Sequence, residues 1–203
     1  MIRIAVFCSG SGTNLQALLD ACAAGTIDGT VALVVSDRKD AYALARAEAA
    51  GVETLYIDPR GFAGKEAYEE KVIAALDGHR IDLICLAGYM RVLSPFFIRR
   101  YKHKILNIHP ALLPAFKGGH AIADALAFGA KVTGVTVHFA TEELDNGPII
   151  LQEAVIIKEG DTPETLLERV HAVEHRLYPQ AVQLIARGRL KVEGRKVHIA
   201  SSE

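Results

Sequence analysis

The feature that most constrains the fold is a regular alternation of short apolar runs with longer segments of helical spacing. Runs rich in Val, Ile and Leu lie at residues 2–8, 30–36, 53–57, 81–87 and 104–109. Between them, segments 13–25, 40–51 and 65–76 have the spacing of helices, and a short helix is predicted near 95–101. Strands buried on both faces are nearly continuous apolar runs, and helices cover them in parallel sheets. The pattern therefore predicts an α/β fold.

The character of the sequence changes after residue 130. Segment 132–140 alternates more between apolar and polar residues, and segment 148–157 follows a turn signal, Asp-Asn-Gly-Pro. We predict that these two segments form an antiparallel pair at the sheet edge, and that 189–200 forms a small hairpin. The predicted fold class is thus a Rossmann-like, mostly parallel twisted sheet with helices on both faces and an antiparallel edge pair at the C-terminal side.

A long helix is predicted over residues 162–188. Thr162 suits the N-cap, and Pro163 suits the first helical position, where its missing N–H costs no hydrogen bond. Pro179 is a candidate for a kink inside this helix. The sequence has no internal repeat, linker or low-complexity segment, so we predict one domain over residues 1–203.

Composition argues against several classes of protein. The formal net charge is -1, so bulk charge favours neither nucleic acid nor an anionic membrane. Cys8, Cys22 and Cys85 have neither the number nor the spacing of a disulfide framework or a zinc site. The N-terminal apolar run is too short for a signal-peptide core, and no run approaches the roughly 20 residues that span a bilayer. We expect a soluble cytoplasmic protein, monomeric or homodimeric, that acts on small molecules.

A glycine-rich turn joins the first predicted strand to the first predicted helix. In Ser-Gly-Ser-Gly-Thr-Asn, Gly10 and Gly12 let backbone amides approach an anion, and Thr13 and Asn14 add side-chain donors at a helix N-terminus. Leu15 stands where the third glycine of a dinucleotide fingerprint would be, and no Lys follows as in a P-loop. A phosphate monoester is therefore the favoured ligand, although a tight turn without a ligand would have the same sequence.

Two polar side chains share one face of the predicted strand that ends at residue 109. Asn107 and His109 are two positions apart, so they point the same way at the carboxyl end of the strand, where α/β sheets bind ligands. Asn107 could donate to a carbonyl or a developing oxyanion, and His109 could transfer or stabilise a proton charge. Asp145, in the turn after segment 132–140, could fix the tautomer of His109 if the two residues meet.

The segment His-Ala-Val-Glu-His at 171–175 matches a zinc-binding pattern in which two His side chains face one metal. That pattern requires a further acidic ligand on a downstream helix, and no such helix is predicted. A helix with an apolar stripe and polar residues beside it explains the segment more simply.

Together these motifs resemble the folate-dependent phosphoribosylglycinamide formyltransferase family. The resemblance covers nearly the whole chain and rests on four segments, namely SGSGTNLQAL (9–18), LAGYMRVLSP (86–95), LNIHPALLP (106–114) and GVTVHFATEELDNGPIILQ (134–152). It implies transfer of a formyl group from 10-formyltetrahydrofolate to the amine of glycinamide ribonucleotide, in purine synthesis, without a metal. It also implies a phosphate-binding half at 1–100 and a catalytic and folate-binding half at 101–203.

The resemblance implies a role for each matching residue. Asn107, His109 and Asp145 match the catalytic trio, in which Asn107 and protonated His109 stabilise an oxyanion and Asp145 holds His109. The residues matching the substrate-binding positions are Gly12, Thr13, Asn14 and Glu174, and those matching the folate-binding positions are Lys65, Met90, Arg91, Val92, Leu93 and Asn107. Lys65 stands where bacterial relatives often have Arg, which leaves its contribution to binding the folate tail open.

Two alternatives stay open at this point. The chain could formylate another amine, such as an amino sugar nucleotide, although no segment suggests a site for the nucleobase. It could also be a non-catalytic folate or nucleotide-binding module, which would be favoured if Asn107, His109 and Asp145 lay far apart in the structure.

Overall fold

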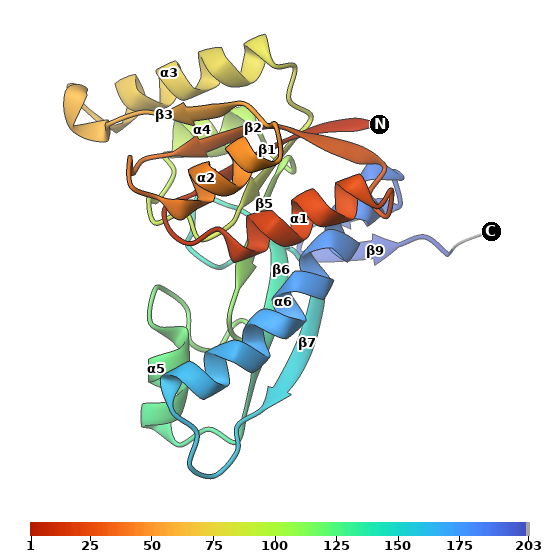
Figure 1. Cartoon of the computed structure of the whole chain (residues 1–203). Coiled ribbons are helices and arrows are strands. Elements are labelled where there is room, and N and C mark those ends of the chain that lie inside the picture. Colours follow the sequence, from red (N-terminus) through yellow and green to blue (C-terminus); the bar gives the residue numbers. More distant parts are fainter. Residues whose placement is uncertain (202–203) are drawn as a thin grey trace.

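The computed structural model describes residues 1–201, and its centre is a seven-stranded sheet (Figure 1). In chain order the strands of this sheet are β1 (Ile2–Cys8), β2 (Gly29–Ser36), β3 (Thr54–Tyr56), β4 (Leu83–Leu86), β5 (Ile105–His109), β6 (Val132–Phe139) and β7 (Ile149–Ile156). They are arranged in the order β3-β2-β1-β4-β5-β6-β7. Strands β1 to β5 pair in parallel, whereas β6 pairs antiparallel with β5 and β7 antiparallel with β6. The predicted fold class and its antiparallel edge pair are confirmed.

Helices cover both faces of the sheet because side chains of the central strands alternate between two apolar cores. Ile4, Val6 and Cys8 of β1 belong to one core, together with residues of α1 (Thr13–Ala23), α2 (Tyr42–Ala49) and α6 (Pro163–Ala186). Ala5 and Phe7 belong to the other core, together with residues of α3 (Lys65–Gly78) and α4 (Pro95–Arg100). Figure 1 shows α3 and α4 on the opposite side of the sheet from α1 and α6.

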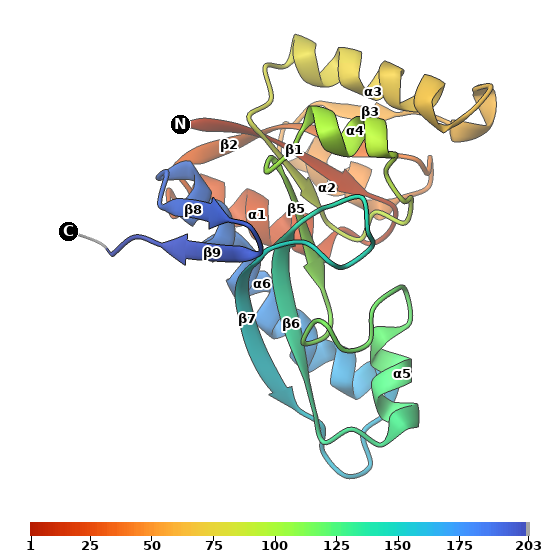
Figure 2. The same ribbon diagram turned by 180° about the vertical axis from the view of Figure 1, so that it is seen from behind.

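The long C-terminal helix begins as predicted. The Thr162 side chain accepts a hydrogen bond from the Thr165 N–H, Pro163 occupies the first turn, and α6 continues through Pro179 to Ala186. The predicted hairpin is also present, as β8 (Leu190–Glu193) paired with β9 (Lys196–Ile199) in a separate sheet. It lies beside β7 (Figure 2).

One α-helix and one short 3-10 helix were not predicted. Helix α5 (Ala121–Phe128) has no capping side chain at His120, so the usual start signal is missing, although Gly129 ends the helix in the left-handed conformation. The 3-10 helix η1 (Pro59–Gly61) is a single turn closed by the Asp58 side chain, which accepts from the Arg60 N–H. The α5 sequence, AIADALAF, is almost entirely apolar and shows no contrast between two faces, and η1 is only one turn long.

Strands β1, β4 and β5 lie next to one another within the sheet. Because they are parallel, their carboxyl ends lie at the same end of the sheet. The loops that follow them therefore meet there, as does the loop between β6 and β7. In the part of the chain that the structure describes, no helix is long and apolar enough to cross a membrane.

Candidate functional site

A cavity of about 490 Å³ opens beyond the carboxyl ends of β1, β4 and β5. Its wall is built from the loops that follow these three strands, from the loop between β6 and β7, and from one face of α6. The residues predicted for the site that line this cavity are Gly12, Thr13, Asn14, Met90, Arg91, Val92, Leu93, Asn107, His109, Asp145 and Glu174. Lys65 is exposed at the start of α3 and is not among the lining residues, so its role stays a prediction.

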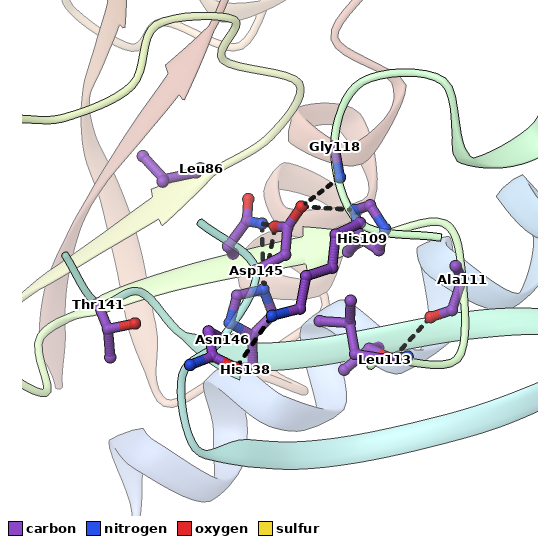
Figure 3. Close-up of polar contacts among 12 residues, drawn as sticks. Leu86, His109, Ala111, Leu113, Gly118, His138, Thr141, Asp145 and Asn146 are labelled. Atoms are coloured by element: carbon purple, nitrogen blue, oxygen red, sulfur yellow. Dashed lines mark hydrogen bonds and ion pairs between the residues drawn. The ribbon is translucent and has the colours of Figure 1, made fainter. Parts of the chain in front are cut away.

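Asp145 lies at the centre of the polar end of the cavity. Its Oδ2 is 3.5 Å from His109 Nδ1 and accepts a 2.9 Å hydrogen bond from the Gly118 N–H. Its Oδ1 accepts a 3.2 Å hydrogen bond from Asn107 Nδ2 and is 3.7 Å from His138 Nε2. Figure 3 shows the carboxylate between His109, His138 and Gly118. The predicted contact between Asp145 and His109 is confirmed. Because Asn107, His109 and Asp145 lie together, the geometry does not favour a non-catalytic binding module.

The loop between β6 and β7 holds Asp145 in a particular backbone conformation. Asp145 has a φ of 49°, in the left-handed region, and Gly147 passes so close to β6 that a Cβ there would be 1.7 Å from the Phe139 carbonyl oxygen. Two cations hold the next residue, because Lys117 donates to Asn146 Oδ1 and Arg195, from the hairpin turn, donates to its backbone oxygen. The carboxylate is thus fixed by both the local backbone and distant contacts.

The charge on Asp145 is maintained despite its burial. Burial alone would raise the pKa of this carboxyl, but interaction with His138, the Gly118 N–H and the charge of His109 together hold the pKa below its usual value. Asp145 is therefore a carboxylate in the neutral range and can stabilise an imidazolium at His109.

The orientation of Asn107 follows from its partners. His138 Nδ1 is 3.0 Å from the Phe139 carbonyl oxygen and donates to it, and His138 Nε2 faces Asn107 and Asp145. Asn107 Nδ2 donates a 3.2 Å hydrogen bond to Asp145 Oδ1 and lies 3.2 Å from His138 Nε2. The amide nitrogen of Asn107 is thus held within the protein, and the carbonyl oxygen is left for a ligand.

His109 is more enclosed than the sequence suggested. Its side chain is buried, and Nε2 lies 2.8 Å from the carbonyl oxygen of Phe116, so Nε2 carries a proton. The other ring nitrogen, Nδ1, faces Asp145. A direct bond from His109 to a ligand requires release of the Phe116 carbonyl.

The glycine-rich turn after β1 is shaped by close packing against α2. Gly12 has a φ of 72°, and a Cβ there would lie 2.7 Å from Ala43 Cβ, so the position requires glycine. The turn places Gly12 directly before the first residue of α1, where free backbone N–H groups and the helix dipole favour an anion. Asn14, in the first turn of α1, donates a 3.0 Å hydrogen bond to Glu174 Oε2 on α6.

Glu174 is a buried carboxyl that faces this turn. Burial raises its pKa to about 7, and the hydrogen bond from Asn14 partly opposes that effect. His171 Nε2 is 3.8 Å from Glu174 Oε2, and its ring stacks on His175 one turn further along α6. Asn14 Oδ1 is buried without a hydrogen-bond partner in the described part of the chain, so a ligand with a hydroxyl would satisfy it.

We expect Glu174 to make folding stability dependent on pH. The folded state keeps the proton up to a pH of about 7, whereas the usual pKa of a Glu side chain, as in the unfolded chain, is 4.5. The wild type therefore loses stability as pH rises through this window, whereas Glu174→Gln stays neutral and does not. The free energy of unfolding of the variant, relative to that of the wild type, should rise by on the order of 3 kcal/mol between pH 4 and pH 8.

Thermal and urea unfolding of both proteins across this range measures the difference. Glu168→Gln, an exposed position on the same helix, serves as the control. If the free energies of unfolding of Glu174→Gln and wild type differed by the same amount at all pH values, the effect of burial on Glu174 would be contradicted.

His138 is the residue of this site that the sequence analysis missed. It lies on β6 directly opposite Asn107 of β5 in the antiparallel pair, and its side chain is only 2% exposed. In the sequence Val-Thr-Val-His-Phe a polar residue recurs at every second position, which indicates that His138 shares a strand face with Thr136. The alignment of His138 with Asn107 depends on strand pairing, which the local sequence does not show. Within residues 1–201, no group of three or more His, Cys, Asp and Glu side chains is placed to hold a metal ion.

Comparisons with known proteins agree with this geometry. A family model described as formyl transferase matches residues 2–182. Phosphoribosylglycinamide formyltransferase of Escherichia coli strain K12 is 44% identical over 94% of this chain and 90% of its own length. The crystal structure of glycinamide ribonucleotide transformylase 1 from Symbiobacterium toebii has a TM-score of 0.97 and 53% identity, covering 99% of this chain and 95% of that one. The trifunctional purine biosynthetic protein adenosine-3 of Gallus gallus is 47% identical over 94% of this chain, which spans only 19% of that protein.

Proposed function

The chain belongs to the formyl transferase family, and from that premise we propose that it transfers a formyl group from 10-formyltetrahydrofolate to the amine of glycinamide ribonucleotide, in de novo purine synthesis. The observation that carries the proposal is the joining, in one cavity, of an anion-binding turn at Gly12 with the cluster of Asn107, His109 and Asp145. A phosphate at one end and a reacting amine at the other fit this arrangement.

The two ends of the cavity have the chemistry that the two substrates need. The phosphate would bind at Gly12 and Thr13, and a ribose hydroxyl would satisfy the buried Asn14 Oδ1 beside Glu174. Elsewhere in the cavity lining, Met90 and Val92 are large hydrophobic side chains, 71% and 55% exposed, that would contact an aromatic ring system. Folate supplies the formyl carbon when it is bound there.

The polar cluster provides charge stabilisation for attack of the amine on this carbon. The Asp145 carboxylate lies 3.5 Å from His109 Nδ1, and a positive charge on that ring would lower the energy of a developing oxyanion. The carbonyl oxygen of Asn107 is available to accept a hydrogen bond from the attacking amine. The amide nitrogen of Asn107, which contacts Asp145 and His138, can also donate to the developing oxyanion.

The proposal is tested by an assay with both substrates. We expect turnover of glycinamide ribonucleotide and 10-formyltetrahydrofolate, followed by the absorbance of the released tetrahydrofolate, at the same rate with and without a chelator. An amino sugar nucleotide in place of the ribonucleotide serves as the competing amine. Turnover with that nucleotide alone, or loss of activity in the chelator, would overturn the proposal.

A further inference from the structure

Glu69 is a fully buried carboxylate that the proposed chemistry does not use. It lies on α3, is 2% exposed, and packs on the face of the sheet away from α1 and α6. Its Oε1 accepts a 2.7 Å hydrogen bond from the Ser94 N–H, and its Oε2 accepts a bond from the Ser94 hydroxyl. A buried carboxylate is costly unless it is well bonded, so this pair of bonds determines where Ser94 can lie.

Ser94 is the point where one wall of the cavity joins the scaffold. Its hydroxyl oxygen accepts from the Phe97 N–H and so caps α4, which begins at Pro95. Residues 88–93, which precede it, all line the cavity and include the exposed Met90 and Val92. The bonds from Glu69 therefore hold the end of this wall that joins α4.

A second anchor holds the other end of the same wall. The Ser9 hydroxyl accepts a 2.9 Å hydrogen bond from the Met90 N–H and donates to Asp37, and the Ser9 N–H donates to the Gly88 carbonyl. Ser9 directly precedes Gly10 of the anion-binding turn, whereas Ser94 is joined to α3 and α4. The two anchors thus divide the wall into a part next to the phosphate end and a part distant from it.

We propose that Glu69 is a positioning residue for the formyl-donor site, which acts through Ser94 to hold residues 91–93 at the distance that a folate ring system requires. The inference rests on the proposed function, because it assigns this wall to folate. It predicts an asymmetry. Loss of the Glu69 anchor weakens binding of the formyl donor and leaves the ribonucleotide largely unaffected, whereas loss of the Ser9 anchor affects both.

The test compares variants at Glu69, at its partner Ser94 and at the exposed neighbour Glu70. Glu69→Ala leaves the buried Ser94 N–H without its partner, and we expect the KM for 10-formyltetrahydrofolate to rise about tenfold while the KM for the ribonucleotide changes less than about twofold. Glu69→Gln keeps an acceptor for the Ser94 N–H and should restore most of the loss. Ser94→Ala keeps the bond from the backbone N–H to Glu69. Its KM for 10-formyltetrahydrofolate should therefore lie between those of Glu69→Gln and Glu69→Ala. Glu70→Gln, exposed on the next position of the helix, is the matched control.

Two further measurements separate the possible outcomes. If Glu69 has only a structural role, Glu69→Ala lowers Tm and the amount of active protein but leaves both KM values unchanged, and this result would overturn the proposal. Direct titration of 10-formyltetrahydrofolate into wild type and Glu69→Ala reports donor binding without any turnover. Wild-type protein that binds the folate but does not formylate the ribonucleotide would contradict the proposed function alone. Equal folate affinities of wild type and variant would contradict the positioning role.

Discussion

Replacing Asp145 with Asn is expected to lower kcat by about two to four orders of magnitude and to change both KM values far less. The change keeps the shape of the side chain but removes its charge. An amide in this place cannot stabilise imidazolium at His109, and it cannot at the same time accept from both Asn107 and the Gly118 N–H with charge-assisted strength. The lost interactions grow as charge develops in the transition state, so the loss is in kcat.

Steady-state kinetics with each substrate varied in turn measure this effect. Asp124→Asn is the control, because Asp124 is exposed in the first turn of α5 and lies outside the cavity. Unfolding in urea shows whether the variant is folded at the assay temperature. A kcat close to wild type would mean that Asp145 only shapes the loop, and the proposed trio would be wrong.

Replacing Gly12 with Ala is expected to raise the KM for the ribonucleotide about tenfold or more, with a small effect on the KM for the formyl donor. Alanine is strained at a φ of 72°, and its methyl group would lie 2.7 Å from Ala43 Cβ and 2.8 Å from Ala43 Cα. The turn must move away from α2 to relieve this contact, which displaces the N–H groups at the start of α1 from the phosphate.

Gly78→Ala provides the comparison, since a Cβ at Gly78 meets no atom within 4 Å and the residue lies in the last turn of α3. That variant should bind both substrates as the wild type does. Binding of inorganic phosphate, measured by calorimetry, should weaken in Gly12→Ala and not in Gly78→Ala. Equal increases in both KM values for Gly12→Ala would count against a phosphate site at this turn.

Features that depend on neighbouring residues were predictable from the sequence. The strands and most helices were found because apolar residues recur with a local period, and the start of α6 was found because Thr162 and Pro163 act within a single helical turn. The turn at Gly12 was recognised for the same reason, since the left-handed conformation and the start of the helix are both local. Helix α5 was missed because its sequence, AIADALAF, is apolar at all positions but one and so shows no contrast between two faces.

The composition of the polar cluster was only partly predictable. Asn107 and His109 share a strand, so their common orientation follows from the two-residue period of a strand. Asp145 could be named from its turn as a possible partner of His109, but nothing local in the sequence shows that the two residues meet. The contact between His138 and Asn107 depends on the register of β5 against β6, and the bond from His109 Nε2 depends on where the Phe116 carbonyl lies.

The sequence by itself determined the order of the elements, the sheet edge at which the loops gather, and the residue types that could carry chemistry there. The tertiary structure alone decided which atoms of those residues remain free. Asn107 donates from its amide nitrogen to Asp145, Glu174 gains a raised pKa from burial, and Glu69 joins Ser94 across 25 positions of the chain. Hydrogen-bond pairing and desolvation depend on distances between residues that are remote in the chain, and a local sequence period contains no information on those distances.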